Sequence, residues 1–154
     1  MRVGRDWIAS HIPHRGAMCL LEGVLAWDER RIVCRAASHR DPANPLRVAG
    51  TLPAACGIEY GAQAMAVHGA LLDAHGAPLG RGYLASVRSV KLHAARLDDV
   101  EGPLRVSAER LSGEDDHVLY AFSVAGDAGE LVSGRATVVL DRSEEHTSEL
   151  QSPS

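Results

Sequence analysis

Glu59 is the residue whose position in the sequence most needs a chemical explanation. It lies in a long apolar segment, residues 54–75, that otherwise carries few ionisable side chains. A buried carboxylate without a partner costs on the order of several kcal/mol, so this group is expected to be protonated, partnered or turned toward a polar cavity. A glutamic acid kept protonated could donate a proton at neutral pH. The alternative is a glutamate near the start of a helix, stabilised by the helix dipole and open to water, and position alone does not separate the two.

Histidine side chains are the second set that could transfer protons, because imidazole titrates near neutral pH. His14 lies in a proline-fixed turn directly before the first apolar segment, and His39 lies in the loop before the long one. Taken alone, both are better explained as solvated or hydrogen-bonded loop residues. His68 follows Glu59 by nine residues and is expected on the opposite helix face, as a core or interface side chain.

The sequence contains no metal, nucleotide or serine-hydrolase motif. It has no HExxH or CxxC spacing, no Walker or GxGxxG pattern and no GxSxG. The three cysteines, Cys19, Cys34 and Cys56, are odd in number and each lies in an apolar run, so reduced and buried thiols are expected. We therefore expect neither a metal ion nor a cofactor.

The composition limits the kinds of partner. The chain has 154 residues, of which 45% are hydrophobic, 23% charged and 4% aromatic, which is typical of one globular domain with an aliphatic core. A formal charge of −4 without a block of Lys or Arg argues against nucleic acid or an anionic membrane as the main partner. No apolar run approaches the roughly 18 residues of a membrane span, and charges occupy the place of a signal-peptide core, so a cytoplasmic location is expected.

The segment 142–154 differs in style from everything before it and has no apolar periodicity. Residues 142–152 can be encoded by a nucleotide run that resembles a widely used sequencing-library adapter read in frame. We therefore interpret residues 1–141 as one domain and 142–154 as an adapter-derived, disordered tail; the alternative is a disordered native tail. Without it the domain carries 15 basic and 17 acidic residues and a charge of −2.

The order of the apolar patterns predicts a hairpin, a long buried helix and a four-stranded meander, after a short helix or turn near residues 6–11. An antiparallel sheet wrapped around one long central helix satisfies this order, because the helix must be covered and the sheet needs something on its concave face. This is the α+β hotdog fold, and its exposed sheet edge favours a dimer. The expected strands are 18–27 and 31–38 in the hairpin, then 83–94, 103–111, 117–126 and 130–140 after the helix 54–75.

Two sequence motifs resemble a known family. Residues 12–24, IPHRGAMCLLEGV, resemble the LPHRxPFLLVDRV segment of the 3-hydroxyacyl-acyl-carrier-protein dehydratases, and residues 52–64, LPAACGIEYGAQA, resemble their MPGVLxxEAxAQ segment. Residues 5–140 are also similar to the divergent dehydratases of aryl-polyene biosynthetic clusters. The positions in register are Pro13, His14, Arg15, Pro53, Glu59 and Gln63.

The resemblance implies a catalytic pair and a binding site around it. His14 would be the base that removes the α-proton of the substrate, and Glu59 the acid that assists the departing β-hydroxyl. In these dimers the two groups typically come from opposite protomers. The substrate would be bound by Pro53, by Gln63, which would orient the Glu59 carboxyl, and by free backbone N–H groups from Ala54 to Gly57, which would stabilise the thioester oxyanion. Gln63 is equally well explained as a helix-packing amide.

The resemblance also implies partners. The acyl carrier protein, with its 4'-phosphopantetheine-linked substrate, is strongly acidic and needs a basic docking surface. Candidate docking residues lie in one strand region, and the alternative is a solvated strand face. The second partner would be another copy of this chain or a different hotdog dehydratase. The docking candidates are Arg81, Arg88, Lys91 and Arg96.

This sequence departs from the family pattern in two places. Ala54 replaces the glycine that follows the proline, and residues 38–51 replace the usual glycine- and proline-rich loop at the substrate mouth. Three functions therefore stay open. The first is a dehydratase, the second a hotdog thioesterase in which Glu59 activates water, and the third a non-catalytic subunit of a heterodimeric dehydratase.

Overall fold

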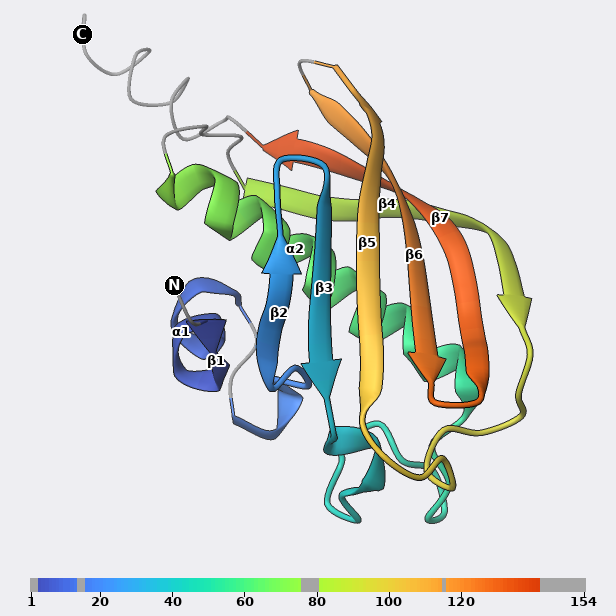
Figure 1. The fold of residues 1–154 in the computed structure, drawn as a ribbon. Helices are drawn as coiled ribbons and strands as arrows, with labels where there is room; N and C mark the ends of the chain where they lie inside the picture. Colours follow the sequence, from blue (N-terminus) through green and yellow to red (C-terminus); the bar gives the residue numbers. More distant parts are fainter. Residues whose placement is uncertain (1–2, 14–15, 76–80, 115, 142–154) are drawn as a thin grey trace, which may run out of the picture.

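The computed structural model describes residues 3–13, 16–75, 81–114 and 116–141 (Figure 1). His14, Arg15 and the segment 142–154 lie outside the described residues, so the expectations for them stay predictions. In chain order the elements are β1 (Val3–Gly4), α1 (Arg5–His11), η1 (Gly16–Met18), β2 (Gly23–Trp27), β3 (Arg31–Ala36), η2 (Ser38–Arg40), η3 (Ala54–Cys56), α2 (Gly57–Ala74), β4 (Arg81–Leu92), β5 (Leu104–Gly113), β6 (His117–Gly126) and β7 (Gly129–Asp141).

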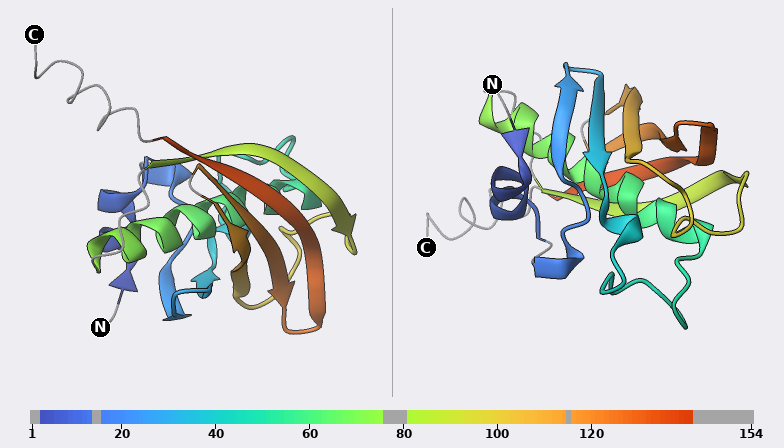
Figure 2. Two further views of the ribbon diagram at one scale, coloured as in Figure 1. Left: turned by 90° about the horizontal axis from the view of Figure 1, so that it is seen from above. Right: turned by 60° about the horizontal axis from the view of Figure 1, so that its bottom comes forward.

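The strands form one antiparallel sheet in the order β1-β2-β3-β5-β6-β7-β4. The sheet curves around α2, which crosses its concave face, and α1 lies beside the β1–β2 edge (Figures 1 and 2). This confirms the expected sheet wrapped around one long helix, and it confirms the short helix near residues 6–11. No helix in the described part of the chain combines the length and apolar character needed to span a bilayer.

Alternating residues of the meander build the core against α2. In β6 the side chains of Val118, Tyr120, Phe122 and Val124 are buried, while their neighbours in the strand are partly exposed. This is the two-residue period of a sheet that has one face in the core. The sequence pattern therefore predicted which face of the sheet meets the helix.

Glycines let the start of α2 press closely onto the sheet. A Cβ atom added to Gly57 would lie 2.8 Å from Cγ2 of Val132, and one added to Gly61 would lie 2.6 Å from Cδ2 of Phe122. Both distances are far below a normal van der Waals contact. The helix can therefore sit this close to β6 and β7 because residues 57 and 61 have no side chain.

The hairpin begins later than the sequence predicts. Residues 18–22 were expected in a strand, but β2 begins at Gly23. The backbone N–H of Leu20 donates to Oε1 of Gln63, and the carbonyl of Met18 accepts from its Nε2. The Gln63 side chain thus binds the backbone N–H of Leu20 and the carbonyl of Met18, which a neighbouring strand would otherwise bind. Residues 18–20 are therefore held against α2 and do not extend β2.

Strand β4 forms one edge of the sheet and leaves apolar side chains uncovered. Leu84 and Leu92 pair across the sheet with Val138 and Val132, whose side chains pack in or against the core. The two leucines themselves are nevertheless 44% and 51% exposed. An open edge with an apolar face is the kind of surface that dimerisation covers.

Candidate active site

Glu59 lies in the first turn of α2 with its side chain partly exposed. Its Oε1 atom lies 3.5 Å from Nε2 of Gln63, one helical turn further along. Gln63 is fully buried, and so is Tyr60, the residue that follows Glu59 in the sequence. Glu59 therefore stands at the boundary between the buried and the open side of the helix, where a carboxyl group can reach a bound molecule while the backbone beneath it stays fixed.

Gln63 fixes the segment that follows His14 against this turn. Its Nε2 donates to the carbonyl of Met18 over 2.7 Å, and its Oε1 accepts from the N–H of Leu20 over 2.9 Å. One remaining N–H of the amide is within reach of Glu59. Gln63 thus has the helix-packing role that was one of the two explanations for it. Its side chain also lies beside the Glu59 carboxyl, as the other explanation requires.

The N–H groups at the start of α2 are less available than expected. The N–H of Ala54 donates to the carbonyl of Ala95 over 3.1 Å, and the N–H of Gly57 donates to Ala54 within the 3-10 turn. Cys56 donates to Pro53 in the same turn. Among the described residues, this leaves Ala55 as the member of the group whose N–H has no acceptor, and Ala55 is exposed. The expectation of free N–H groups from 54 to 57 is therefore corrected to this one residue.

Tyr60 joins the loop before α2 to the helix, a contact that the sequence analysis missed. Its hydroxyl pairs with Oγ of Ser38 at 2.8 Å and accepts from Nδ2 of Asn44 at 3.1 Å, and Ser38 in turn donates to the carbonyl of Leu20. Burial raises the pKa of the Tyr60 phenol. The polar residues of the 38–51 loop thus hold that loop against the face of α2 that neighbours Glu59.

The four docking candidates do not form one free cationic surface. Arg88 and Lys91 are exposed on β4, and Arg88 lies opposite the exposed Arg135 of β7. The side chain of Arg81 lies outside the described part. Arg96 was predicted to face the carrier, but its guanidinium is paired with Asp98 and lies near Asp99. Since that charge is already neutralised, we remove Arg96 from the docking surface.

The buried histidines are satisfied or enclosed as core residues. Nδ1 of His68 pairs with the Tyr120 hydroxyl at 2.6 Å, and its Nε2 pairs with the carbonyl of Asp28 at 2.8 Å. His39 is also fully buried, with Nε2 at 3.0 Å from the carbonyl of Val100. Burial lowers the pKa of both imidazoles. The core position predicted for His68 is confirmed.

The thiols and a groove on the sheet carry no chemistry of this site. Cys19, Cys34 and Cys56 are all free, and burial raises the pKa of the Cys34 thiol to about 12, so it is inert as a nucleophile. No group of three or more potential metal ligands occurs among the described residues. A groove of about 670 Å³ lies on the outer face of the sheet, between residues such as Arg31 and Arg135, and no residue of α2 lines it.

Comparison with known proteins supports one family. The model of the ApeP-like family, described as ApeP dehydratase, matches residues 7–150, which includes part of the segment interpreted above as adapter-derived. Comparison with proteins of curated function finds no match.

Solved structures similar to this chain share its fold. The dehydratase heterocomplex ApeI:P from Xenorhabdus doucetiae matches with a TM-score of 0.77 and 21% identity, over 94% of this chain and 97% of that one. Zebra fish thioesterase superfamily member 2 matches with a TM-score of 0.64 and 13% identity, over 89% and 95%. AziG from S. sahachiroi matches with a TM-score of 0.52 and 20% identity, over 76% and 88%. The family model matches most of the chain, and the sheet with its central helix has the fold of these structures, so this chain belongs to the ApeP-like family of hotdog-fold dehydratases.

Proposed function

We propose that this protein dehydrates 3-hydroxyacyl thioesters carried by acyl carrier protein to trans-2-enoyl thioesters. The observation that carries the proposal is Glu59 on the first turn of the central helix, with Gln63 joining that turn to the segment that follows His14. The family match supports a dehydratase, and the motif around residues 12–24 supports His14 as the second catalytic group.

The reaction needs one base, one acid and a site for negative charge. His14 would take a proton from C2 of the substrate, and the electron pair would shift toward the thioester carbonyl to give an enolate-like oxygen. The N–H of Ala55 would stabilise that oxygen. As the pair returns to form the C2–C3 double bond, the C3–O bond breaks, and the hydroxyl leaves as water with a proton from Glu59. Proton exchange with solvent then restores neutral His14 and protonated Glu59.

Two protomers are part of this proposal. The uncovered apolar edge at β4 supports a dimer, and the ApeI:P structure shows that a structurally similar dehydratase occurs in a heterocomplex. We propose that the carrier protein docks near Arg88 and Lys91, which are exposed on the same edge strand, with Arg81 as a further candidate.

The test is conversion of a synthetic 3-hydroxyacyl carrier thioester by the purified protein, followed by intact-mass spectrometry of the carrier. The proposal expects the carrier to lose the mass of one water molecule, and it expects Glu59→Gln to lose that conversion. Release of free carrier thiol without the enoyl product would instead identify a thioesterase.

A non-catalytic subunit is the second candidate, and the heterocomplex of the similar structure favours it. In that case the chain alone would be inactive, and mixing it with a second hotdog dehydratase would produce activity that survives Glu59→Gln in this chain. If the activity of the mixture is instead lost with Glu59→Gln, this chain is a catalytic subunit.

A further inference from the structure

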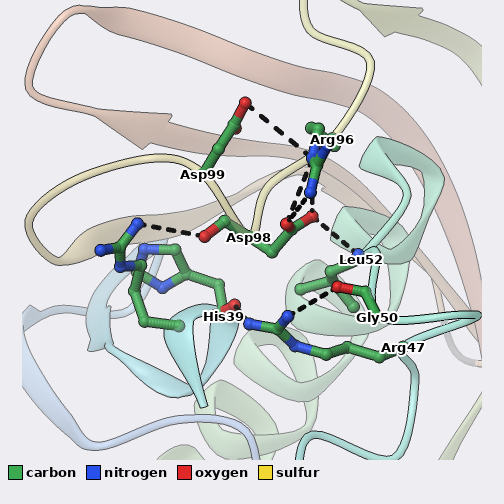
Figure 3. A network of polar contacts seen from close by, with 8 residues as sticks. His39, Arg47, Gly50, Leu52, Arg96, Asp98 and Asp99 are labelled. Atoms are coloured by element: carbon green, nitrogen blue, oxygen red, sulfur yellow. Dashed lines mark hydrogen bonds and ion pairs between the residues drawn. The ribbon is translucent and has the colours of Figure 1, made fainter. Parts of the chain in front are cut away.

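Asp98 joins the connection after β4 to the segment that leads into α2. It is 8% exposed, and its Oδ1 atom accepts a hydrogen bond from the backbone N–H of Leu52 over 2.8 Å (Figure 3). Leu52 is separated from Asp98 by 46 positions in the chain and is fully buried. The carboxylate is therefore fixed to a backbone group that lies just before the helix carrying Glu59.

Arg96 holds this carboxylate in place. Its Nε donates to both carboxylate oxygens at 3.1 Å, and its Nη2 pairs with Oδ2. The guanidinium and the Leu52 N–H together keep the pKa of Asp98 well below its usual range. A forked guanidinium bound to both oxygens also fixes the rotation of the carboxylate, which directs Oδ1 at Leu52.

Backbone hydrogen bonds extend this junction along the residues that precede Asp98. The N–H of Leu97 donates to the carbonyl of Leu52 over 2.8 Å, and the N–H of Ala54 donates to the carbonyl of Ala95 over 3.1 Å. Pro53 and Arg96 form an isolated antiparallel bridge between these bonds. Residues 52–54 are thus held against residues 95–97, and the 3-10 turn η3 leads from them into the first turn of α2.

The loop on the other side of Leu52 is held by a second arginine. Arg47 donates to the carbonyl of Gly50 over 2.8 Å and to that of His39 over 3.1 Å (Figure 3). It closes a turn in which Ala49 and Gly50 have positive φ values of 51° and 81°. This turn leads directly to Leu52, whose N–H donates to Asp98. Asp98 is therefore the charged contact that connects a tight loop to the amino-terminal end of α2.

We propose that Asp98 is a positioning residue of the active site: it sets the place of the first turn of α2, and so of the Glu59 carboxyl and the Ala55 N–H. The inference rests on the proposed function for its effect on turnover. Catalytic groups must stay within a fraction of an ångström of their productive geometry, and a displacement of about 1 Å costs on the order of a hundredfold in rate. Only the 3-10 turn η3 and the start of α2 separate Leu52, the partner of Asp98, from Glu59. A shift of the Leu52 backbone would therefore also move the Glu59 carboxyl.

The test compares Asp98→Asn with a matched control, Asp99→Asn. Asp99 is the adjacent acid, is 63% exposed in its side chain and lies 3.9 Å from Arg96 Nε. With its Oδ1 on the Leu52 N–H, the asparagine of Asp98→Asn would place an N–H₂ group where Oδ2 accepts from Arg96. The variant therefore loses the negative charge and the two-oxygen contact with the guanidinium that fixes the rotation of the group. We expect kcat to fall at least about tenfold with KM within about threefold, and both constants to stay within about twofold in Asp99→Asn.

Amide hydrogen exchange provides a readout that does not depend on activity. In Asp98→Asn, the amides of Leu52, Ala54 and Leu97 should exchange at least about tenfold faster than in the wild type, while the Phe122 amide in the sheet keeps its protection. A general loss of stability would speed exchange at Phe122 as well. Unchanged exchange at Leu52 would overturn the proposal whether or not the protein is a dehydratase.

The outcomes separate the two proposals. If the wild type is active and Glu59→Gln is not, a kcat of Asp98→Asn within about twofold of wild type overturns the role of Asp98 and leaves the function intact. If the wild type is inactive both alone and in a mixture with a second hotdog dehydratase, the dehydratase proposal fails, and the exchange measurement alone decides whether Asp98 positions the helix. If Asp98→Asn does not fold, Arg96→Gln replaces it, because Arg96 is 45% exposed; unchanged kcat and exchange in that variant would also overturn the proposal.

Discussion

Gln63 on the central helix accepts a hydrogen bond from the backbone N–H of Leu20 over 2.9 Å and so joins the two motifs that carry the family resemblance. The same amide donates to the carbonyl of Met18, and Gln63 is fully buried. The contact explains why residues 18–22 leave the predicted strand. It also makes the position of the segment after His14 depend on one side chain of α2.

Replacement of Gln63 by leucine should destabilise the fold. Leucine has a similar volume but leaves the Leu20 N–H and the Met18 carbonyl without partners, which costs about 2–4 kcal/mol for the two groups together. Urea unfolding followed by circular dichroism measures this change. Glu59→Gln, at a partly exposed position one turn away, is the control and should stay within about 0.5 kcal/mol of wild type. Equal stability of Gln63→Leu and the control would show that these hydrogen bonds are dispensable.

The sequence allowed the prediction of elements whose signals are local. The alternation in β6 and the apolar segment of α2 each occupy a single stretch of chain, and the spacing from Pro53 to Glu59 and Gln63 places all three at one end of one helix. The acid that pairs with Arg96 is only two residues away, but the contact that fixes this acid in place comes from a distant part of the chain. Arg96 was therefore predicted as a docking residue, because Asp98 can act on Leu52 only after the sheet has brought residues 95–98 beside the start of α2.

Mixing two inactive variants tests whether His14 and Glu59 act across the dimer. We expect His14→Ala and Glu59→Gln each to lose dehydration. If the two groups come from opposite protomers, a mixed dimer contains one complete site, and unfolding and refolding the variants together at equal amounts should restore about a quarter of wild-type activity, given random pairing. Each variant refolded alone is the control. No recovery in a mixture that contains mixed dimers would place both groups in one protomer.

Charge reversal on β4 tests the docking of the carrier protein. Arg88→Glu together with Lys91→Glu should raise KM for the carrier-bound substrate about tenfold or more, with little effect on kcat, and the wild-type KM should rise with salt because exposed charges are screened. A substrate on a short pantetheine thioester lacks the acidic carrier and serves as the control. An equal loss with both substrates would indicate damage to the site instead of lost docking.

A pair of glycine variants in α2 tests how tightly the helix packs. Gly61→Ala would place a Cβ atom 2.6 Å from the Phe122 ring, and we expect it to destabilise the protein by about 1–3 kcal/mol. Gly69→Ala adds the same methyl group where, apart from the neighbouring residues and backbone of the helix itself, no described atom lies within 4 Å, and it should stabilise the helix by about 0.5–1 kcal/mol. Thermal unfolding of both variants measures the difference. The two changes in stability are expected to have opposite signs. Two stabilised variants would mean that helix propensity dominates at both sites, and two destabilised variants would mean that packing does.

Stability should fall with decreasing pH because of His68. Burial lowers the pKa of its imidazole in the folded protein below 6.5, so the unfolded chain binds a proton that the folded protein resists. The free energy of unfolding should therefore decline as the pH falls below about 6.5 and level off below the folded pKa. His39, whose pKa burial also lowers, contributes in the same direction. His68→Gln retains a polar side chain that does not titrate there, so its free energy of unfolding should depend less on pH between about 7 and 5. Parallel curves for the two proteins, measured by urea unfolding at each pH, would show that His68 is not the source of this dependence.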